Sequence, residues 1–88
     1  MAIGQKEWIA KYDKYTIRVV NTWLSGAKLY INGEIRAVND NLFEISGSSP
    51  SLSAHLDNGE IVEVFVSAVL TTKAKICVNG EQIGGDVF

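Results

Sequence analysis

The chain has 88 residues, a hydrophobic content of 47% and a formal net charge of −2, which fits a single small domain with a thin stability margin. No apolar run approaches the ~20 residues that cross a bilayer, and the first residues lack the apolar segment of a signal peptide. The single cysteine, Cys77, can form no internal disulfide, so we expect a cytoplasmic domain with no membrane association.

The first half of the chain predicts antiparallel strands. Apolar and polar side chains alternate with period two from Tyr15 to Trp23, which is the pattern of a half-buried strand. Asn32-Gly33 is typical of a two-residue type I′ hairpin. The strands expected in this half cover residues 6–11, 15–23, 28–31, 34–38 and 42–45.

The second half repeats these signals after a loop. The segment 46–51 holds the only proline and is predicted to join the two halves. A second Asn-Gly hairpin is expected at Asn79-Gly80, and no segment has helical periodicity. Strands are expected at residues 52–56, 60–70 and 74–78, with a return strand after the hairpin. This pattern predicts an all-β fold, a small antiparallel β-sandwich or flattened barrel.

The two halves resemble each other in sequence. Residues 17–37 align with residues 64–84 without a gap, and Asn32-Gly33-Glu34 falls on Asn79-Gly80-Glu81. Asn-Gly hairpins are common, so shared strand composition is the alternative to a genuine duplication.

A duplication would define the architecture of the domain 1–88. The chain would consist of two similar β-meanders, over about 6–45 and 52–88, related by a pseudo-twofold axis. Extended backwards, the gapless alignment places Trp8 on His55.

The run Ile17–Arg36 combines a strand, a Ser25-Gly26 turn, an aliphatic strand, the Asn32-Gly33 hairpin and a return strand. This arrangement resembles the β-sandwich domains of the Fas apoptosis inhibitory molecule family, in which a similar hairpin is also repeated. The resemblance covers only part of the chain. It implies a noncatalytic β-sandwich that acts through protein contacts, and it carries over no individual site residue.

The residues that carry chemistry do not form a catalytic or metal-binding set. His55 is the only histidine and lacks the partners of a triad or a zinc site. Cys77 lies between Ile76 and Val78 and is predicted to be a small half-buried hydrophobic residue. We therefore expect no enzyme activity, no cofactor and no metal.

Aromatic and basic residues alternate in the first third of the chain. Tyr15 and Trp23 fit the core pattern, which leaves Trp8, Tyr12 and Tyr30 as a candidate ligand platform. Exposed rings can stack on sugars or, beside cations, on single-stranded nucleic acid. The pI of about 5.2 argues against nucleic acid and favours carbohydrate as the ligand of such a platform.

The outward positions of the long strands differ between the halves. In the gapless alignment Arg18 corresponds to Phe65 and Tyr30 to Cys77. The outer face of the first half is therefore expected to be polar. That of the second half would present a candidate protein interface of Ile61, Phe65, Val69 and Cys77. An apolar strand face requires cover, either from the other sheet or from another subunit.

Two functions from different classes remain. The preferred one is a noncatalytic protein-interaction or structural module that binds a protein partner or itself, as a homodimer. The alternative is a small ligand-binding domain that uses the three aromatic rings. Residues 1–36 hold six Lys or Arg against three Asp or Glu, whereas residues 37–72 hold five Asp or Glu and no Lys or Arg. Attraction between these regions can act within the fold or between copies.

Overall fold

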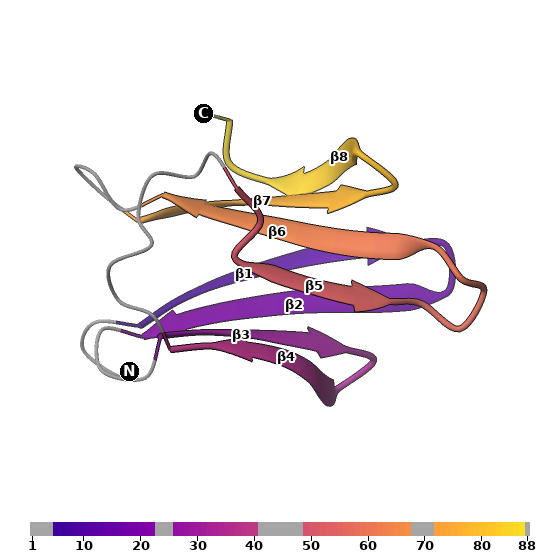
Figure 1. The fold of residues 1–88 in the computed structure, drawn as a ribbon, viewed down its shortest axis with the longest axis horizontal. Coiled ribbons are helices and arrows are strands. Elements are labelled where there is room, and N and C mark those ends of the chain that lie inside the picture. Colours follow the sequence, from indigo (N-terminus) through magenta and orange to yellow (C-terminus); the bar gives the residue numbers. More distant parts are fainter. Residues whose placement is uncertain (1–4, 23–25, 41–48, 68–71, 88) are drawn as a thin grey trace.

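The structure is a computed structural model that describes residues 5–22, 26–40, 49–67 and 72–87. Within these residues it contains strands and no helix, which confirms the predicted all-β fold of two similar meanders (Figure 1). The strands are β1 (Gln5–Tyr12), β2 (Tyr15–Thr22), β3 (Gly26–Ile31), β4 (Glu34–Asn39), β5 (Leu52–His55), β6 (Ile61–Ser67), β7 (Lys73–Val78) and β8 (Glu81–Gly85). The strand predicted over 42–45 falls outside the described ranges.

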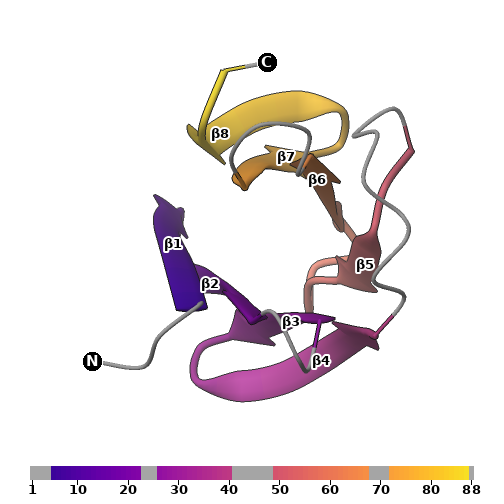
Figure 2. The same ribbon diagram turned by 90° about the vertical axis from the view of Figure 1, so that its left-hand side faces the viewer.

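The strands form two antiparallel sheets in simple sequential order. Sheet A has the order β1-β2-β3-β4, and sheet B has the order β5-β6-β7-β8. Their inner faces enclose one core, with β1 beside β8 and β4 beside β5 (Figure 2). The sheets therefore meet along two seams, and a pseudo-twofold rotation that exchanges the sheets also exchanges the seams.

Both Asn-Gly hairpins adopt the predicted turn. The φ angles are 52° and 82° at Asn32-Gly33, and 49° and 84° at Asn79-Gly80, as a type I′ turn requires. The Asn32 side chain accepts a hydrogen bond of 2.8 Å from the backbone N–H of Thr16, and Asn79 accepts one of 3.0 Å from Ile61. Each asparagine thus joins its turn to the neighbouring strand.

The backbone register corrects the gapless alignment of the two halves. Ile31 corresponds to Val78 because both precede an Asn-Gly turn, and their cross-strand partners are Ile17 and Val62. Ile17 therefore corresponds to Val62 and not to Val64. The connection between the second and third strands is two residues longer in sheet B than in sheet A, which an alignment without gaps cannot represent.

The same correction changes which residues of β1 correspond to which residues of β5. Ala10 pairs with Ile17 and Ala54 pairs with Val62, so Ala10 and Ala54 correspond to each other. Trp8 consequently corresponds to Leu52 and not to His55. Sequence identity alone did not define this register, because the strand register depends on the lengths of the turns.

The buried core agrees with the corrected correspondence between the two halves. The largest fully buried side chains form three matched pairs, one member from each sheet: Ile17 and Val62, Val19 and Val64, Leu29 and Ile76. Burial of each such side chain contributes about 1.5–3 kcal/mol of hydrophobic free energy. The structural repeat therefore accounts for the packing of the domain core.

Candidate functional site

The three rings predicted to form a ligand platform do not share a surface. Trp8 and Tyr12 pack against the core on the inner side of β1. Tyr30 lies on the outer face of sheet A, where the Arg18 guanidinium is 5.0 Å from its ring centroid. The sequence contains a signal for this result, because Tyr12 pairs with Tyr15 across a tight turn and paired residues share a face.

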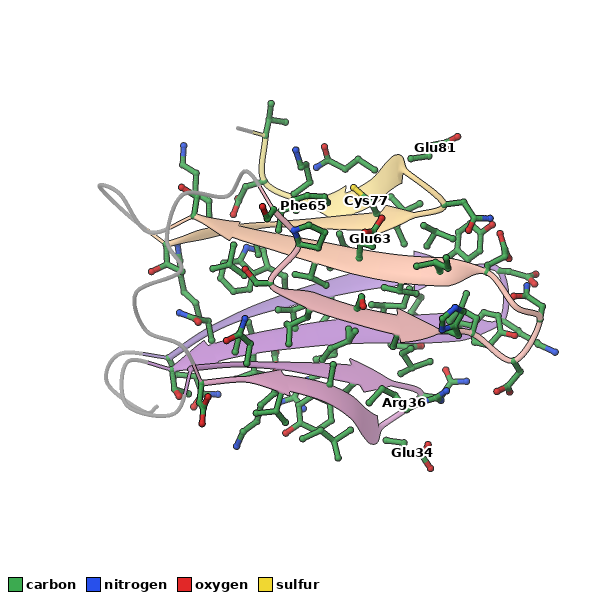
Figure 3. All side chains as sticks on the ribbon, in the orientation of Figure 1. Glu34, Arg36, Glu63, Phe65, Cys77 and Glu81 are labelled. Atoms are coloured by element: carbon green, nitrogen blue, oxygen red, sulfur yellow. The ribbon has the colours of Figure 1, made fainter. Side chains whose placement is uncertain are left out.

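The candidate interface on sheet B lies on the outer face but is only partly open. Ile61 is 41% exposed and Phe65 is half-buried, with the Lys75 ammonium 5.1 Å from its ring centroid. Figure 3 shows Phe65, Glu63 and Cys77 together on the face formed by β6 and β7. Val69 is not among the residues that the structure describes.

Cys77 is more deeply buried than the sequence pattern predicts. Its side chain belongs to the outer face of sheet B, yet the residue is only 5% exposed. Burial raises the pKa of its thiol, an effect that the nearby Lys75 partly offsets. The environment is that of an inert structural thiol.

The outer face of sheet A carries more exposed aliphatic surface than expected. Ile9 and Val38 are both 57% exposed and Ile35 is 48% exposed. In the sheet register Ile9, Arg18, Tyr30 and Ile35 form one row across the four strands. We call Ile9, Tyr30, Ile35 and Val38 the sheet A patch. The prediction of a polar outer face for the first half was wrong, because it considered the middle strands and not β1 and β4.

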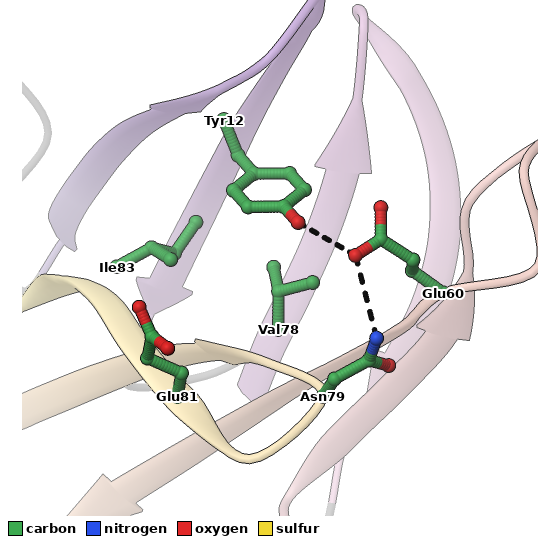
Figure 4. Close-up of a pocket in the computed structure, with 6 residues that line it drawn as sticks. All are labelled: Tyr12, Glu60, Val78, Asn79, Glu81 and Ile83. Carbon is green, nitrogen blue, oxygen red and sulfur yellow. Dashed lines mark hydrogen bonds between the residues drawn. The ribbon is translucent and has the colours of Figure 1, made fainter.

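A hollow opens at the end of the molecule where β1 approaches the β7–β8 hairpin (Figure 4). Its volume is about 250 Å³, and it is lined by Tyr12, Glu60, Val78, Asn79, Glu81 and Ile83. We call it the Tyr12 hollow. Two carboxylates, one phenol and two aliphatic side chains thus face the same space, and none of the described residues that line it is a Lys or Arg.

Glu60 is held in place by hydrogen bonds at the wall of the Tyr12 hollow. Its Oε2 accepts hydrogen bonds from the Tyr12 hydroxyl at 2.6 Å and from the Asn79 side-chain amide at 3.3 Å. The bond to Glu60 raises the pKa of the Tyr12 phenol, and the negative charges of Asp13 and Glu81 act in the same direction. The hollow therefore has a negative electrostatic environment.

The sequence contained a signal for the Tyr12 hollow that its motifs did not reveal. The two hairpins share not only their turns but also the irregularity in register that follows them. Through that shared register Glu34 corresponds to Glu81, and Arg36 corresponds to Ile83. The sequence alignment already showed that Ile83 replaces Arg36 while the neighbouring carboxylate is retained. The contacts that Arg36 makes are known only from the structure.

Among the residues that the structure describes, no group of three or more His, Cys, Asp or Glu side chains comes together as a metal site. No helix in the same ranges is long and apolar enough to span a bilayer.

Comparisons with known proteins return no significant match of this chain to a protein-family model, to a curated protein or to a solved structure. The resemblance of Ile17–Arg36 to the Fas apoptosis inhibitory molecule family stays a prediction.

Proposed function

We propose that this chain is a noncatalytic, cytoplasmic protein-interaction module that forms a homodimer through the sheet A patch. The observation that carries the proposal is the exposure of Ile35, Val38 and Ile9 on one sheet face. Aliphatic side chains gathered on one face lose their contact with water when a second surface covers them, and this burial favours association.

A second copy of the chain fits this face. Homodimers with twofold symmetry bring the same surface of both subunits together, so a patch must be complementary to itself. Charged side chains lie within the sheet A patch: Arg18, paired to Glu7, lies between Ile9 and Tyr30, and Lys28 lies beside Val38. Interfaces combine apolar side chains with polar and charged groups, and arginine is enriched in them.

The outer face of sheet B is the weaker candidate. Phe65 is half-buried with the Lys75 ammonium above its ring, and Cys77 is almost fully buried, so less apolar surface is open to a partner there. The lone, buried thiol also suits a reducing compartment, which supports the cytoplasmic assignment.

Sedimentation velocity of Ile35→Lys tests the proposal. The wild-type chain is expected to sediment as a dimer and Ile35→Lys as a folded monomer, because a lysine inside the interface would be desolvated. Ser53→Lys is the matched control, since it adds the same charge to the exposed outer face of sheet B. It should leave the dimer intact.

Circular dichroism of each variant separates loss of association from loss of folding. A wild-type chain that is monomeric at its highest soluble concentration would overturn the proposal. A dimer that Phe65→Asp dissociates and Ile35→Lys does not would reject the sheet A patch as the interface.

A further inference from the structure

In the first half of the molecule an arginine side chain makes polar contacts within the chain. The Arg36 side chain places one guanidinium nitrogen 3.6 Å from a carboxylate oxygen of Glu34 and donates a hydrogen bond of 3.0 Å from another to the backbone carbonyl of His55. The guanidinium thus lies between the acidic residue of the β3–β4 hairpin and the neighbouring strand β5. It occupies the seam between the two sheets.

The second half retains this carboxylate and lacks the cation. Glu81 corresponds to Glu34 through the matched hairpin register, but the position of Arg36 holds Ile83. Among the residues that the structure describes, Glu81 forms no ion pair. The Tyr12 hollow opens beside Ile83, where the shorter side chain leaves space.

The walls of the Tyr12 hollow suit a flat cation. Figure 4 shows Glu81 and Glu60 on opposite sides of the hollow, with the Tyr12 ring and Val78 between them. A guanidinium is planar, pairs with a carboxylate through two parallel hydrogen bonds and stacks on aromatic rings. A lysine ammonium fits this combination less well because it is a strongly hydrated point charge.

We propose that the Tyr12 hollow binds an alkyl-guanidinium group, with the Glu81 carboxylate as its ionic partner and Tyr12, Val78 and Ile83 packing against its plane and stem. Arg36 and Glu34 form the corresponding ion pair within the chain, with 3.6 Å between the guanidinium nitrogen and the carboxylate oxygen. This site lies away from the sheet A patch, so it does not depend on the proposed dimer.

The test uses N-acetyl-arginine amide as the probe and backbone amide chemical shifts as the readout. Saturable shifts are expected at Asn79 and Glu81, with a dissociation constant on the order of 1 mM for a single side chain. The matched probe N-acetyl-citrulline amide has nearly the same shape but a neutral urea in place of the guanidinium. It should not bind.

Two variants place the binding at this hollow. Glu81→Gln keeps the shape and removes the charge, and it should weaken binding about fivefold, as loss of a partly exposed ion pair of about 1 kcal/mol does. Glu34→Gln makes the same change at the corresponding position of the other hairpin and should leave binding unchanged. Ile83→Arg should abolish binding because its own guanidinium would occupy the hollow.

Three results would overturn the proposal: no saturable shift with N-acetyl-arginine amide, equal binding of the citrulline probe, or unchanged affinity in Glu81→Gln. If Ile83→Arg does not fold, the comparison of Glu81→Gln with Glu34→Gln alone decides whether the probe binds at this hollow. A blocked Gly-Arg-Gly peptide then identifies the source of the guanidinium. Tighter binding of the peptide than of the single residue indicates an arginine in a protein chain, and equal binding indicates a small free guanidinium compound.

Discussion

The indole Nε1 of Trp8 donates a hydrogen bond of 2.8 Å to Oδ2 of Asp86, and this bond joins the first strand to the end of the last across the seam between β1 and β8. The same oxygen accepts a hydrogen bond of 3.1 Å from the backbone N–H of Ala74. Asn39 holds the corresponding position in the other half and donates from its side chain to the Ser51 carbonyl at 2.8 Å. Both seams are therefore closed by a side chain at the end of the last strand of a meander.

Asp86 should make the stability of the domain dependent on acid. The hydrogen bond from Trp8, followed by that from Ala74, lowers the pKa of Asp86 in the folded state. Its contribution is therefore fully present above the unfolded pKa of about 3.9 and is lost as the pH falls through the folded pKa. In urea unfolding, Asp86→Ala should cost about 1 kcal/mol at neutral pH and less near pH 3. Asn39→Ala removes the corresponding bond without a titrating group, so its cost should be the same at both pH values. Equal losses for Asp86→Ala at both pH values would contradict this prediction.

Tyr12 should ionise later than an ordinary tyrosine. Its hydrogen bond to Glu60 raises the pKa of the phenol in the folded state. The associated stability is present below the unfolded pKa of about 10 and is lost as the pH rises through the folded pKa. An ultraviolet absorbance titration should show a late tyrosinate transition that disappears in Tyr12→Phe and moves to lower pH in Glu60→Gln. Unchanged titration of Glu60→Gln would show that the bond is not maintained in solution.

Gly84 allows β8 to approach β1 closely. A Cβ at this position would lie 2.6 Å from the Cβ of Ala10, which is shorter than real contacts permit. Gly84→Ala should therefore destabilise the domain by about 1–3 kcal/mol through overpacking. In a double-mutant cycle, Ala10→Gly should recover part of this loss, since it removes the clashing atom. Strictly additive effects of the two substitutions would indicate that the strands separate easily at this point.

Cys77 should react slowly with thiol reagents in the folded protein. The residue is 5% exposed, and burial raises the pKa of its thiol. Disulfide-exchange labelling is expected to be at least about tenfold slower in the native state than in urea. A cysteine introduced by Ser53→Cys, in the background of Cys77→Ser, lies exposed on the same sheet face and should react quickly. Rapid native labelling of Cys77 would mean that the outer face of sheet B opens in solution.

The fold was predictable because its signals are local. Alternation of apolar residues and the two Asn-Gly turns depend on neighbours in the chain, and both appear in the structure as expected. The correspondence of Ile17 with Val62 was not predictable in the same way, because cross-strand pairing depends on how many residues each connection contains.

The site was harder to predict than the fold. The rings of Trp8 and Tyr12 lie next to lysines in the sequence, which suggested an exposed platform, but strand alternation directs them inward. The exposed aliphatic residues of β1 and β4 carried no motif, and Ile35 and Val38 lie on either side of a hairpin irregularity that shifts the alternation. The role proposed for Ile83 in the Tyr12 hollow was inferred from a contact that Arg36 makes at the corresponding position of the other half.

The two seams exchanged by the pseudo-twofold rotation are unequal in covalent terms. Residues 40–51 connect β4 to β5 covalently, so one seam is tethered. The seam between β1 and β8 is closed by contacts such as Trp8 with Asp86 and Lys6 with the Thr72 carbonyl. The tethered seam can serve as a hinge, and the seam between β1 and β8 can separate. Partial opening of the domain should therefore begin between its first and last strands, and the same movement would open the Tyr12 hollow, for which we propose guanidinium binding.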